Sequence, residues 1–523
     1  MEYGNMKYVS VEEMVQIEQE SDARGHTYPE MMERAGRGLA EVVQETYADL
    51  ESRKVIALVG SGNNGGDALV ALDYLASWGW EVTALILRSR GDDDPLESRV
   101  REAGGRVLEI TGEGVRETIK REIPVHTVLL DGVLGTGIRL PVRGELGERL
   151  DAARRILAGM EDPPHVVAVD CPSGVDADTG EVDPSCIPAE ITVTMAAVKQ
   201  GLLKFPAFRF LGDLRVVGIG LPDDLESYRA VNREVVGYDW VKRTLPSRPL
   251  ESHKGTFGTA LIVAGSVNFT GAAALSAEGA YRVGVGLVSL AVPEPLHPAL
   301  AGSLPETTWL PLPAVNGCIA QDALSVIEGY MDRTSGLLVG PGFGTHESTK
   351  TFLIHLLQSS SLPPMVVDAD GLKLISSVAN WEKDIPSPSV LTPHPGEMSV
   401  MTGLSTGEIQ NDRVGVAERY AREWGHVVVL KGAHTVIASP GGQTRILPLA
   451  TPALASAGTG DVLAGVIVGF VAQGMEPFAA ASIGAWIHAQ AGLTAAARLG
   501  NTASVLASDV ADSLVDVMSW FDI

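Results

Sequence analysis

The sequence predicts two consecutive α/β domains whose sheets are mostly parallel. Three observations support this fold class. The chain of 523 residues is longer than one hydrophobic core normally serves. Short apolar runs typical of buried strands alternate with longer runs typical of helices. A charged, proline-punctuated stretch, residues 222–253, interrupts this alternation near the middle of the chain.

The composition disfavours several classes of function. Hydrophobic residues make up 45% and charged residues 20%, and the net charge of -25 argues against a nucleic-acid or anionic-membrane partner. The apolar runs near 462–472 and 478–497 are too short, or too rich in glycine and alanine, for a membrane span. The three cysteines lack the spacing of a metal site and, being odd in number, cannot all pair as disulfides, which suits a reducing cytoplasm. The N-terminal residues show no signal-peptide pattern.

In the first half, residues 9–19 and 28–47 are predicted to be helices, the second because its apolar residues recur at helical spacing. A series of short apolar runs follows, separated at first by helical segments, which favours a mostly parallel sheet. The predicted strands are 54–59, 81–87, 126–133, 165–173, 191–197 and 214–220.

A glycine-rich loop follows the first of these strands. Its residues 60–65 satisfy G-x-G-x-x-G, which alone is a weak signal for a dinucleotide site. The next strand ends with Arg88 and Arg90 rather than with an acid, so a nicotinamide-dependent oxidoreductase that accepts a 2′-phosphate stays an alternative. The side-chain oxygens of Asn63, Asn64 and Asp67 favour instead a cation or a polyol at this loop.

Two later strand ends carry similar chemistry. Asp131 and then Asp170 with Ser173 lie at the ends of predicted strands, and loops at the carboxyl ends of parallel strands converge on one crevice. Asn64, Asp131 and Ser173 can therefore meet around a hard cation that prefers oxygen ligands. Asp170 remains for proton transfer or for a sugar hydroxyl. Each residue taken singly can also be explained as a turn former.

The second domain is predicted to begin near Asp239, inside the charged stretch. Strand-and-turn units again alternate with helices, such as 271–284 after the turn at Asn268, and a terminal helix covers 507–521. Polar residues gather in the turns 340–344 and 392–398 and in the hairpin that begins at Lys431. Each of these residues also has an alternative explanation without a functional role. His394 can be a buried structural histidine, and Lys431 can be a solvated charge at the hairpin. No P-loop motif occurs.

The stretch 452–474 places one acid between a flexible loop and an apolar helix. Residues 458–460 are Gly-Thr-Gly, Asp461 follows, and residues 462–472 carry no charge. The start of such a helix can bind an anion such as phosphate. Asp461 beside it is suited to take a proton from an attacking hydroxyl. Alternatively, Asp461 is only the N-cap of a core helix.

These motifs resemble one known family. The segments HKGTFG, TGAAAL, GPGFG, DADGL, LTPHPGEM, VVVLKGAHT and AGTGDVLAG resemble the ribokinase-like ADP-dependent NAD(P)H-hydrate dehydratases. The segments MMERAG, GSGNNGGD, LDGVLGTG and VDCPSGVDADTG resemble the NAD(P)H-hydrate epimerases. Their order is that of the bifunctional NAD(P)H-hydrate repair enzymes. The resemblance implies a Rossmann-like three-layer epimerase domain over 1–238 and a ribokinase-like dehydratase domain over 239–523.

The resemblance implies repair of nicotinamide cofactors that have gained water across a ring double bond. One domain would interconvert the R and S hydrates of NADH and NADPH. The other would use ADP, with Mg²⁺ on its phosphates, to phosphorylate the ring hydroxyl of the S form, so that phosphate leaves and AMP remains. Potassium would bind the epimerase domain at Asn64, Asp131 and Ser173. We expect a cytoplasmic homo-oligomer without nucleic-acid or membrane partners.

The site residues that the resemblance implies fall into three sets. In the epimerase, contacts to the hydrate are expected from Asn63, Asn64, Gly65, Gly66, Asp67, Gly135, Thr136, Gly137, Ile138, Arg139, Leu140, Pro141 and the catalytic Asp170. In the dehydratase, they are expected from Gly342, His394, Pro395, Gly396, Glu397, Met398, Ser399, Val400 and the base Asp461. The nucleotide is expected at Lys431, Gly432, Ala433, His434, Thr435, Thr451, Pro452, Ala453, Leu454, Ala455, Ser456, Ala457, Gly458, Thr459 and Gly460.

The sequence leaves three alternatives open. Lys199 is a second candidate for proton transfer in the epimerase. A ribokinase-type kinase for another small molecule shares Asp461 and its loop, and differs in leaving the phosphate on its substrate. A non-catalytic cofactor-binding protein would have no need of Asp461.

Overall fold

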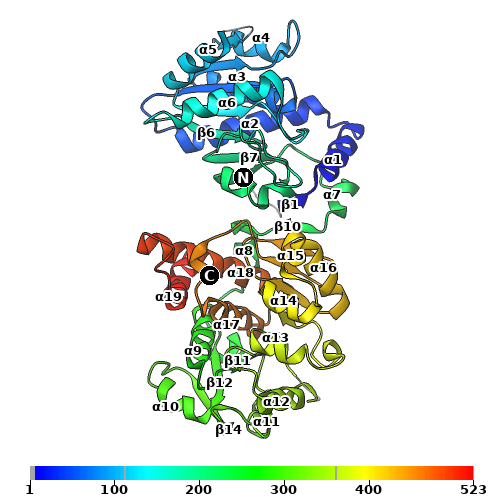
Figure 1. Ribbon diagram of the computed structural model, residues 1–523, viewed down its shortest axis with the longest axis vertical. Helices are drawn as coiled ribbons and strands as arrows, with labels where there is room; N and C mark the ends of the chain where they lie inside the picture. The colour runs from blue at the N-terminus through cyan, green and yellow to red at the C-terminus, as the bar shows by residue number, and fades with distance from the viewer. Residues whose placement is uncertain (1–5, 111–113, 360–361, 522–523) are drawn as a thin grey trace. The chain divides into compact units, whose positions relative to one another are not determined.

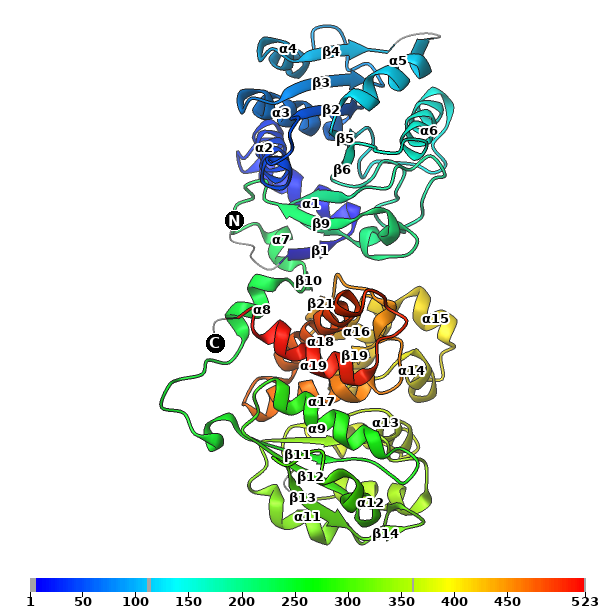
Figure 2. The same cartoon turned by 90° about the vertical axis from the view of Figure 1, so that its left-hand side faces the viewer.

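The structure is a computed structural model that describes residues 6–110, 114–359 and 362–521. The described residues form two compact units, 6–232 and 233–521, shown in Figures 1 and 2. The predicted boundary after residue 238 assigned six more residues to the first unit, but β10 (Arg233–Val235) pairs with β21 (Thr444–Ile446) of the second. Within the described residues, no helix has the length and apolar character needed to cross a membrane.

The N-terminal unit alternates strands and helices. In chain order its elements are β1 (Met6–Val9), α1 (Val11–Ala23), α2 (Tyr28–Tyr47), β2 (Lys54–Val59), α3 (Asn63–Ser77), β3 (Glu81–Ile86), α4 (Pro95–Glu102), β4 (Arg106–Glu109), α5 (Val115–Glu122), β5 (Val128–Gly132), α6 (Gly144–Ala158), β6 (His165–Val169), β7 (Ile191–Met195), β8 (Val198–Lys199), β9 (Asp213–Val217) and α7 (Glu226–Ala230). Seven strands form a sheet in the order β4-β3-β2-β5-β6-β7-β9. All its pairings are parallel.

Helices cover both faces of this sheet, as its continuous apolar strands predict. On one face Val55 and Ala57 of β2 pack with residues of α1, α2 and α3. On the other, Ile56 and Leu58 pack with residues of α5 and α6. The predicted three-layer α/β fold is therefore confirmed, and Figure 2 shows α3 and α6 on opposite sides of the strands. The carboxyl ends of the parallel strands all meet at one edge.

The C-terminal unit repeats this plan with a larger sheet. In chain order its elements are β10, α8 (Tyr238–Thr244), β11 (Thr259–Val263), α9 (Thr270–Arg282), β12 (Leu287–Pro293), α10 (His297–Leu300), β13 (Thr308–Leu312), β14 (Ala314–Val315), β15 (Cys318–Ile319), α11 (Leu324–Met331), β16 (Gly336–Val339), α12 (Glu347–Leu357), β17 (Met365–Val367), α13 (Asp370–Ile375), β18 (Val390–Leu391), α14 (Pro395–Thr402), α15 (Thr406–Asn411), α16 (Arg413–Trp424), β19 (Val427–Leu430), β20 (Val436–Ala438), β21, α17 (Thr459–Ala472), α18 (Pro477–Leu499) and α19 (Ala507–Met518).

Within this unit the strand order is β13-β12-β11-β16-β17-β18-β19-β20-β21-β10. The strands from β13 to β19 pair in parallel, and β20 pairs antiparallel with both of its neighbours. One face packs against α8, α9, α17, α18 and α19, and the other against α11 to α16. The predicted second α/β domain is therefore confirmed.

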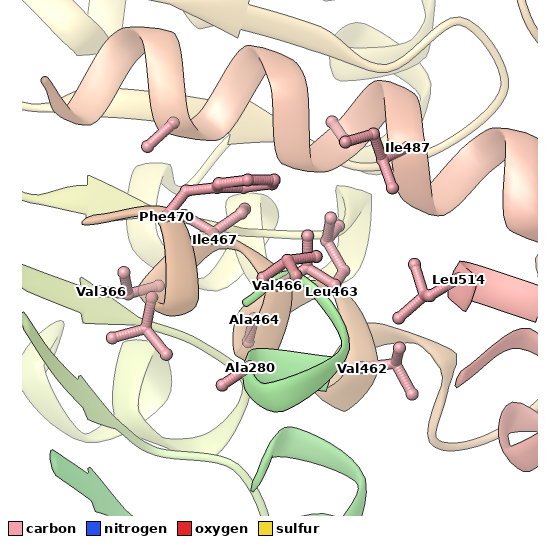
Figure 3. Close-up of a cluster of buried hydrophobic side chains, with 14 of the residues drawn as sticks. Ala280, Val366, Val462, Leu463, Ala464, Val466, Ile467, Phe470, Ile487 and Leu514 are labelled. Carbon is pink, nitrogen blue, oxygen red and sulfur yellow. The ribbon is translucent and has the colours of Figure 1, made fainter. Parts of the chain in front are cut away.

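Helix α17 lies at the centre of one of these layers. Every residue from Val462 to Ala472 is buried, as expected of a helix that is apolar all round. Figure 3 shows its side chains among Ala280 of α9, Val366 of β17, Ile487 of α18 and Leu514 of α19. Because neighbours surround it, the N-terminus of α17 is held in a fixed position.

The contact between α9 and α17 depends on glycine. A Cβ atom at Gly465 would lie 2.1 Å from the carbonyl oxygen of Ser276, and one at Gly279 would lie 2.5 Å from that of Val462. Gly465→Ala is therefore expected to destabilise the protein by about 1–3 kcal/mol, because backbone must move to admit the methyl group. Calorimetric unfolding measures the loss. Gly271→Ala, where a Cβ meets nothing within 4 Å, is the control; an equal fall in both variants contradicts the explanation.

Candidate active sites

The first site lies where α17 begins. Gly458 is the N-cap residue, with a φ of 90° that glycine adopts without steric cost. Asp461 is the third residue of the helix, so the alternative that it serves only as the N-cap is wrong. The first N–H groups of a helix have no partner within the helix and can bind an anion. Asp461 therefore lies beside a potential phosphate-binding site at the start of the helix and does not itself cap the helix.

The surroundings of Asp461 change its acidity. Burial, followed by the negative charge of Asp368, raises the pKa of Asp461 to about 7, although the ammonium group of Lys431 opposes the change. The hydroxyl group of Ser276 donates a hydrogen bond of 3.1 Å to the backbone carbonyl of Asp461. A positioned carboxyl group that titrates near neutral pH is suited to act as a general base.

Lys431 follows β19 in the predicted hairpin, whose antiparallel pairing with β20 is present. Its Nζ atom lies 2.7 Å from Oδ1 of Asp368 and 3.7 Å from Oε2 of Glu397. Burial lowers the pKa of Lys431, but these carboxylates outweigh it and raise the pKa overall. A Cβ at Gly460 would lie 3.5 Å from Nζ. Lys431 is thus a partly buried, paired cation beside the start of α17 and not a solvated hairpin charge.

The acids at the end of β17 were not singled out from the sequence. Asp368 is 1% exposed and accepts a hydrogen bond of 2.6 Å from the Thr392 hydroxyl as well as the contact from Lys431. Asp370 accepts bonds of 2.9 Å from the Gly344 amide and from Lys373. The signal was available, because both acids come directly after the buried strand β17.

His394 caps α14. Its Nδ1 accepts a hydrogen bond of 2.9 Å from the amide of Gly396, and its Nε2 lies 3.3 Å from Oε1 of Glu397. Burial lowers the pKa of His394 more than Glu397 raises it. The ring is about half exposed, so His394 is not a buried structural histidine. Within the predicted stretch, the side chain of Met398 is fully buried in the core, whereas Val400 is 60% exposed.

The other predicted residues of this unit form the surrounding loops. Gly342 has a φ of 65° and packs closely against Phe269 at the start of α9. Thr459 donates 2.9 Å hydrogen bonds to the carbonyls of Leu454 and Ser456, which fold the predicted nucleotide loop onto the helix start. Burial lowers the pKa of His434 to about 4, so its ring is neutral near pH 7.

The second site is a cavity of about 550 Å³ in the N-terminal unit. It lies along the carboxyl ends of β3, β2, β5 and β6 and reaches α1. Of the predicted hydrate contacts, those that line it are Asn63, Asn64, Asp67, Gly135, Thr136, Gly137, Ile138 and Asp170. Those outside its lining are Gly65, Gly66, Arg139, Leu140 and Pro141.

Asp170 and Lys199 meet in this cavity. Oδ1 of Asp170 lies 2.5 Å from Nζ of Lys199 and also accepts hydrogen bonds from the Thr194 hydroxyl and the Met195 amide. Asp170 has a φ of 63°, a conformation that is uncommon outside glycine and that often marks functional sites. Lys199 is 2% exposed. The two residues that the sequence offered as alternatives for proton transfer thus form one buried ion pair.

Two further carboxyl groups line the cavity. Burial, and then the charge of Asp170, raise the pKa of Asp67 well above its ordinary value. Burial also raises the pKa of Glu18, which lies on α1 and was not predicted. Pattern analysis could not find Glu18, because only the fold brings α1 to the carboxyl edge of the sheet.

The predicted cation ligands gather around Leu134. Nδ2 of Asn64 donates hydrogen bonds of 2.9 Å and 2.7 Å to the carbonyls of Leu134 and Val169. The Ser173 hydroxyl donates to Oδ1 of Asp131 at 2.6 Å and accepts from the Leu134 amide. Burial raises the pKa of Asp131 although Ser173 binds it. The described residues contain no cluster of three or more His, Cys, Asp or Glu side chains that could hold a metal.

Comparison with known proteins identifies the family. Residues 29–201 match the family described as YjeF-related protein N-terminus, and residues 260–515 match NAD(P)H-hydrate dehydratase. The bifunctional NAD(P)H-hydrate repair enzyme of Moorella thermoacetica is 37% identical over 93% of this chain and 92% of its own. The chain belongs to the bifunctional NAD(P)H-hydrate repair enzymes. The enzyme of that name from Salinibacter ruber is 37% identical over 92% of this chain and 91% of its own.

A solved structure gives a further comparison for the C-terminal half. The ADP/ATP-dependent NAD(P)H-hydrate dehydratase of Bacillus subtilis, co-crystallised with ATP and Mg²⁺, is 33% identical. It covers 54% of this chain and 96% of its own, with a TM-score of 0.46. Membership of the repair-enzyme family rests on the sequence relatives, which span both units.

Family membership also decides between the alternatives that the sequence left open. A nicotinamide-dependent oxidoreductase and a non-catalytic cofactor-binding protein are both excluded. In the structure, the guanidinium group of Arg90 makes its contacts within the protein. Its Nη1 donates to the carbonyls of Gly60 and Gly62, and its Nε donates to Asp94. Arg90 therefore holds the glycine-rich loop in place.

Proposed function

We propose that the C-terminal unit transfers the terminal phosphoryl group of ADP to the ring hydroxyl of the S hydrate of NADH or NADPH. Asp461 takes the hydroxyl proton, the hydroxyl oxygen attacks phosphorus, and the bond to the AMP oxygen breaks. The carbon–oxygen bond of the new ester then breaks, phosphate leaves with the electron pair, and loss of a neighbouring proton restores the double bond. The observation that carries this proposal is the Asp461 carboxyl beside Lys431 at the N-terminus of α17.

Magnesium would bind mainly through the nucleotide. Asp368 and Asp370 already accept hydrogen bonds from Lys431, Thr392, Gly344 and Lys373. Mg²⁺ commonly keeps few protein ligands and binds substrate phosphates, which fits this arrangement. When bound, it would offset the charge of the phosphates, while Lys431 stabilises the phosphoryl group from the side of the protein.

We propose that the N-terminal unit interconverts the R and S hydrates in the cavity beside Asp170. The buried pair of Asp170 and Lys199 can hold and return one proton there. The donor set of Asn64, Asp131 and Ser173 fits K⁺, because it offers oxygen atoms and one buried carboxylate, with the Leu134 and Val169 carbonyls nearby. Bound K⁺ would fix the loop at Leu134 that leads to the predicted hydrate contacts.

The proposal is tested by giving the purified protein a mixture of R and S hydrates of NADH with either ADP or ATP. We expect the absorbance of the dihydronicotinamide ring to return with ADP while free phosphate and AMP accumulate. Phosphate that stays attached to the substrate would instead indicate a ribokinase-type kinase. The same assay with ATP determines which donor the enzyme prefers.

The dehydratase should depend on pH through Asp461. A base must be deprotonated to act, and the pKa of Asp461 is about 7. We therefore expect kcat/KM for dehydration to fall about tenfold per pH unit below this pKa and to level off above it. Initial rates from pH 5 to 9 measure this profile. A flat profile across this range contradicts the role of Asp461 as base.

A further inference from the structure

The epimerase cavity has an uneven distribution of charge. Three carboxyl groups, those of Glu18, Asp67 and Asp170, line it, and the cation among them, Lys199, is already paired with Asp170. A dinucleotide brings at least two further negative charges on its phosphates. These groups offer the phosphates no unpaired cation, so we expect the phosphates to lie at a cation elsewhere in the cavity.

Arg88 is the cationic side chain that can receive them. It follows β3, is exposed, and lines the cavity. Among the described residues it has neither a hydrogen bond nor an ion pair, whereas Arg90 is bound to two carbonyls and to Asp94. Arg88 therefore has its guanidinium group available for a ligand.

Arg88 and Asp170 lie at separate positions along the sheet. Arg88 follows β3, Asp170 follows β6, and β2 and β5 lie between these strands. Three strand spacings place the two positions about 14 Å apart along the edge. The residues between them include Ser61, Gly62 and Asn63 at the start of α3, where backbone N–H groups are available. The cavity thus has one end that suits proton transfer and another that suits an anion.

We propose that Arg88 binds a phosphate group of the hydrated dinucleotide and so sets the direction in which the substrate lies in the epimerase cavity. The hydrated ring then lies beside Asp170 and Lys199, and the phosphates lie toward β3. The planar guanidinium group can donate two parallel hydrogen bonds to a phosphate. This inference rests on the proposed epimerase function of the cavity.

The test compares Arg88→Gln and Arg88→Lys with the wild-type full-length protein. R/S exchange is measured with hydrated NADH and separately with hydrated NADPH. We expect Arg88→Gln to raise KM about tenfold with little change in kcat, and Arg88→Lys to restore part of the loss. Arg116→Gln is the matched control, because Arg116 is exposed on α5, lies outside the cavity lining and carries the same charge.

The two substrates distinguish the two sources of phosphate. A rise in KM for both indicates the pyrophosphate, and a rise for hydrated NADPH alone indicates the 2′-phosphate. An unchanged KM, a loss confined to kcat, or an equal rise in Arg116→Gln overturns the inference. Calorimetric titration with unreacted NADPH provides a readout without turnover, in which Arg88→Gln should bind about tenfold more weakly. If the wild-type protein shows no R/S exchange, the proposed function fails, and equal NADPH affinities in wild type and variant would reject the role of Arg88 as well.

Discussion

Asp461→Asn is expected to lower ADP-dependent dehydration of the S hydrate about a thousandfold while R/S exchange continues at the wild-type rate. The amide cannot accept the hydroxyl proton, and general-base catalysis of this kind contributes 10²–10⁴-fold in other enzymes. Free phosphate release and the return of dihydronicotinamide absorbance measure dehydration. Exchange between the R and S forms, followed by chromatography, measures the other activity in the same preparation.

The fold should tolerate this substitution. Asn has nearly the shape of Asp, Gly458 rather than residue 461 caps α17, and the contact from Ser276 goes to the backbone carbonyl. Replacing the carboxyl group of Asp461 also removes its repulsion with Asp368, which contributes to the raised pKa of Asp461. The melting temperature should therefore stay close to the wild-type value. Dehydration within tenfold of wild type would place the base elsewhere.

Lys431 shows which features of the site the sequence could predict and which it could not. The hairpin and the lysine at its turn were evident, because a β-branched run and a glycine define them locally. Its surroundings were not, since Asp368 follows β17 and Glu397 lies on α14, both far from Lys431 in the sequence. Partners that parallel strands bring together from distant parts of the chain leave no local pattern.

The difference between local patterns and long-range contacts also explains which other predictions agree with the structure. Residues 28–47 and 54–59 were predicted with the bounds that α2 and β2 have, because periodicity and apolar length are local properties. The boundary after residue 238 differed because β10 is a three-residue strand whose partner, β21, lies far along the chain. Glu18 was missed for a similar reason, since its helix reaches the cavity only in the folded unit.

Replacing Asp170 is expected to stop R/S exchange and to leave the dehydratase active. The decisive substitution is Asp170→Asn, because Asn tolerates the left-handed conformation at φ 63° and can still accept the bonds from Thr194 and Met195. Asp170→Ala removes the only carboxylate bound to the buried Lys199 within the described residues. An unpaired buried charge typically costs about 3–5 kcal/mol, so that variant should also unfold at a lower temperature.

The expected result is visible in a single reaction. With a mixture of hydrates and excess ADP, the wild-type protein should consume both forms, because exchange supplies S from R. Asp170→Asn should consume the S hydrate at the wild-type rate and then stop with the R hydrate remaining, apart from slow spontaneous exchange. Adding the separate Asp461→Asn protein, which retains exchange, to this reaction should allow the R hydrate to be consumed as well. Complete consumption by Asp170→Asn alone would show that proton transfer in the epimerase does not depend on Asp170, and failure of the mixture would show that the two activities are not separable in this way.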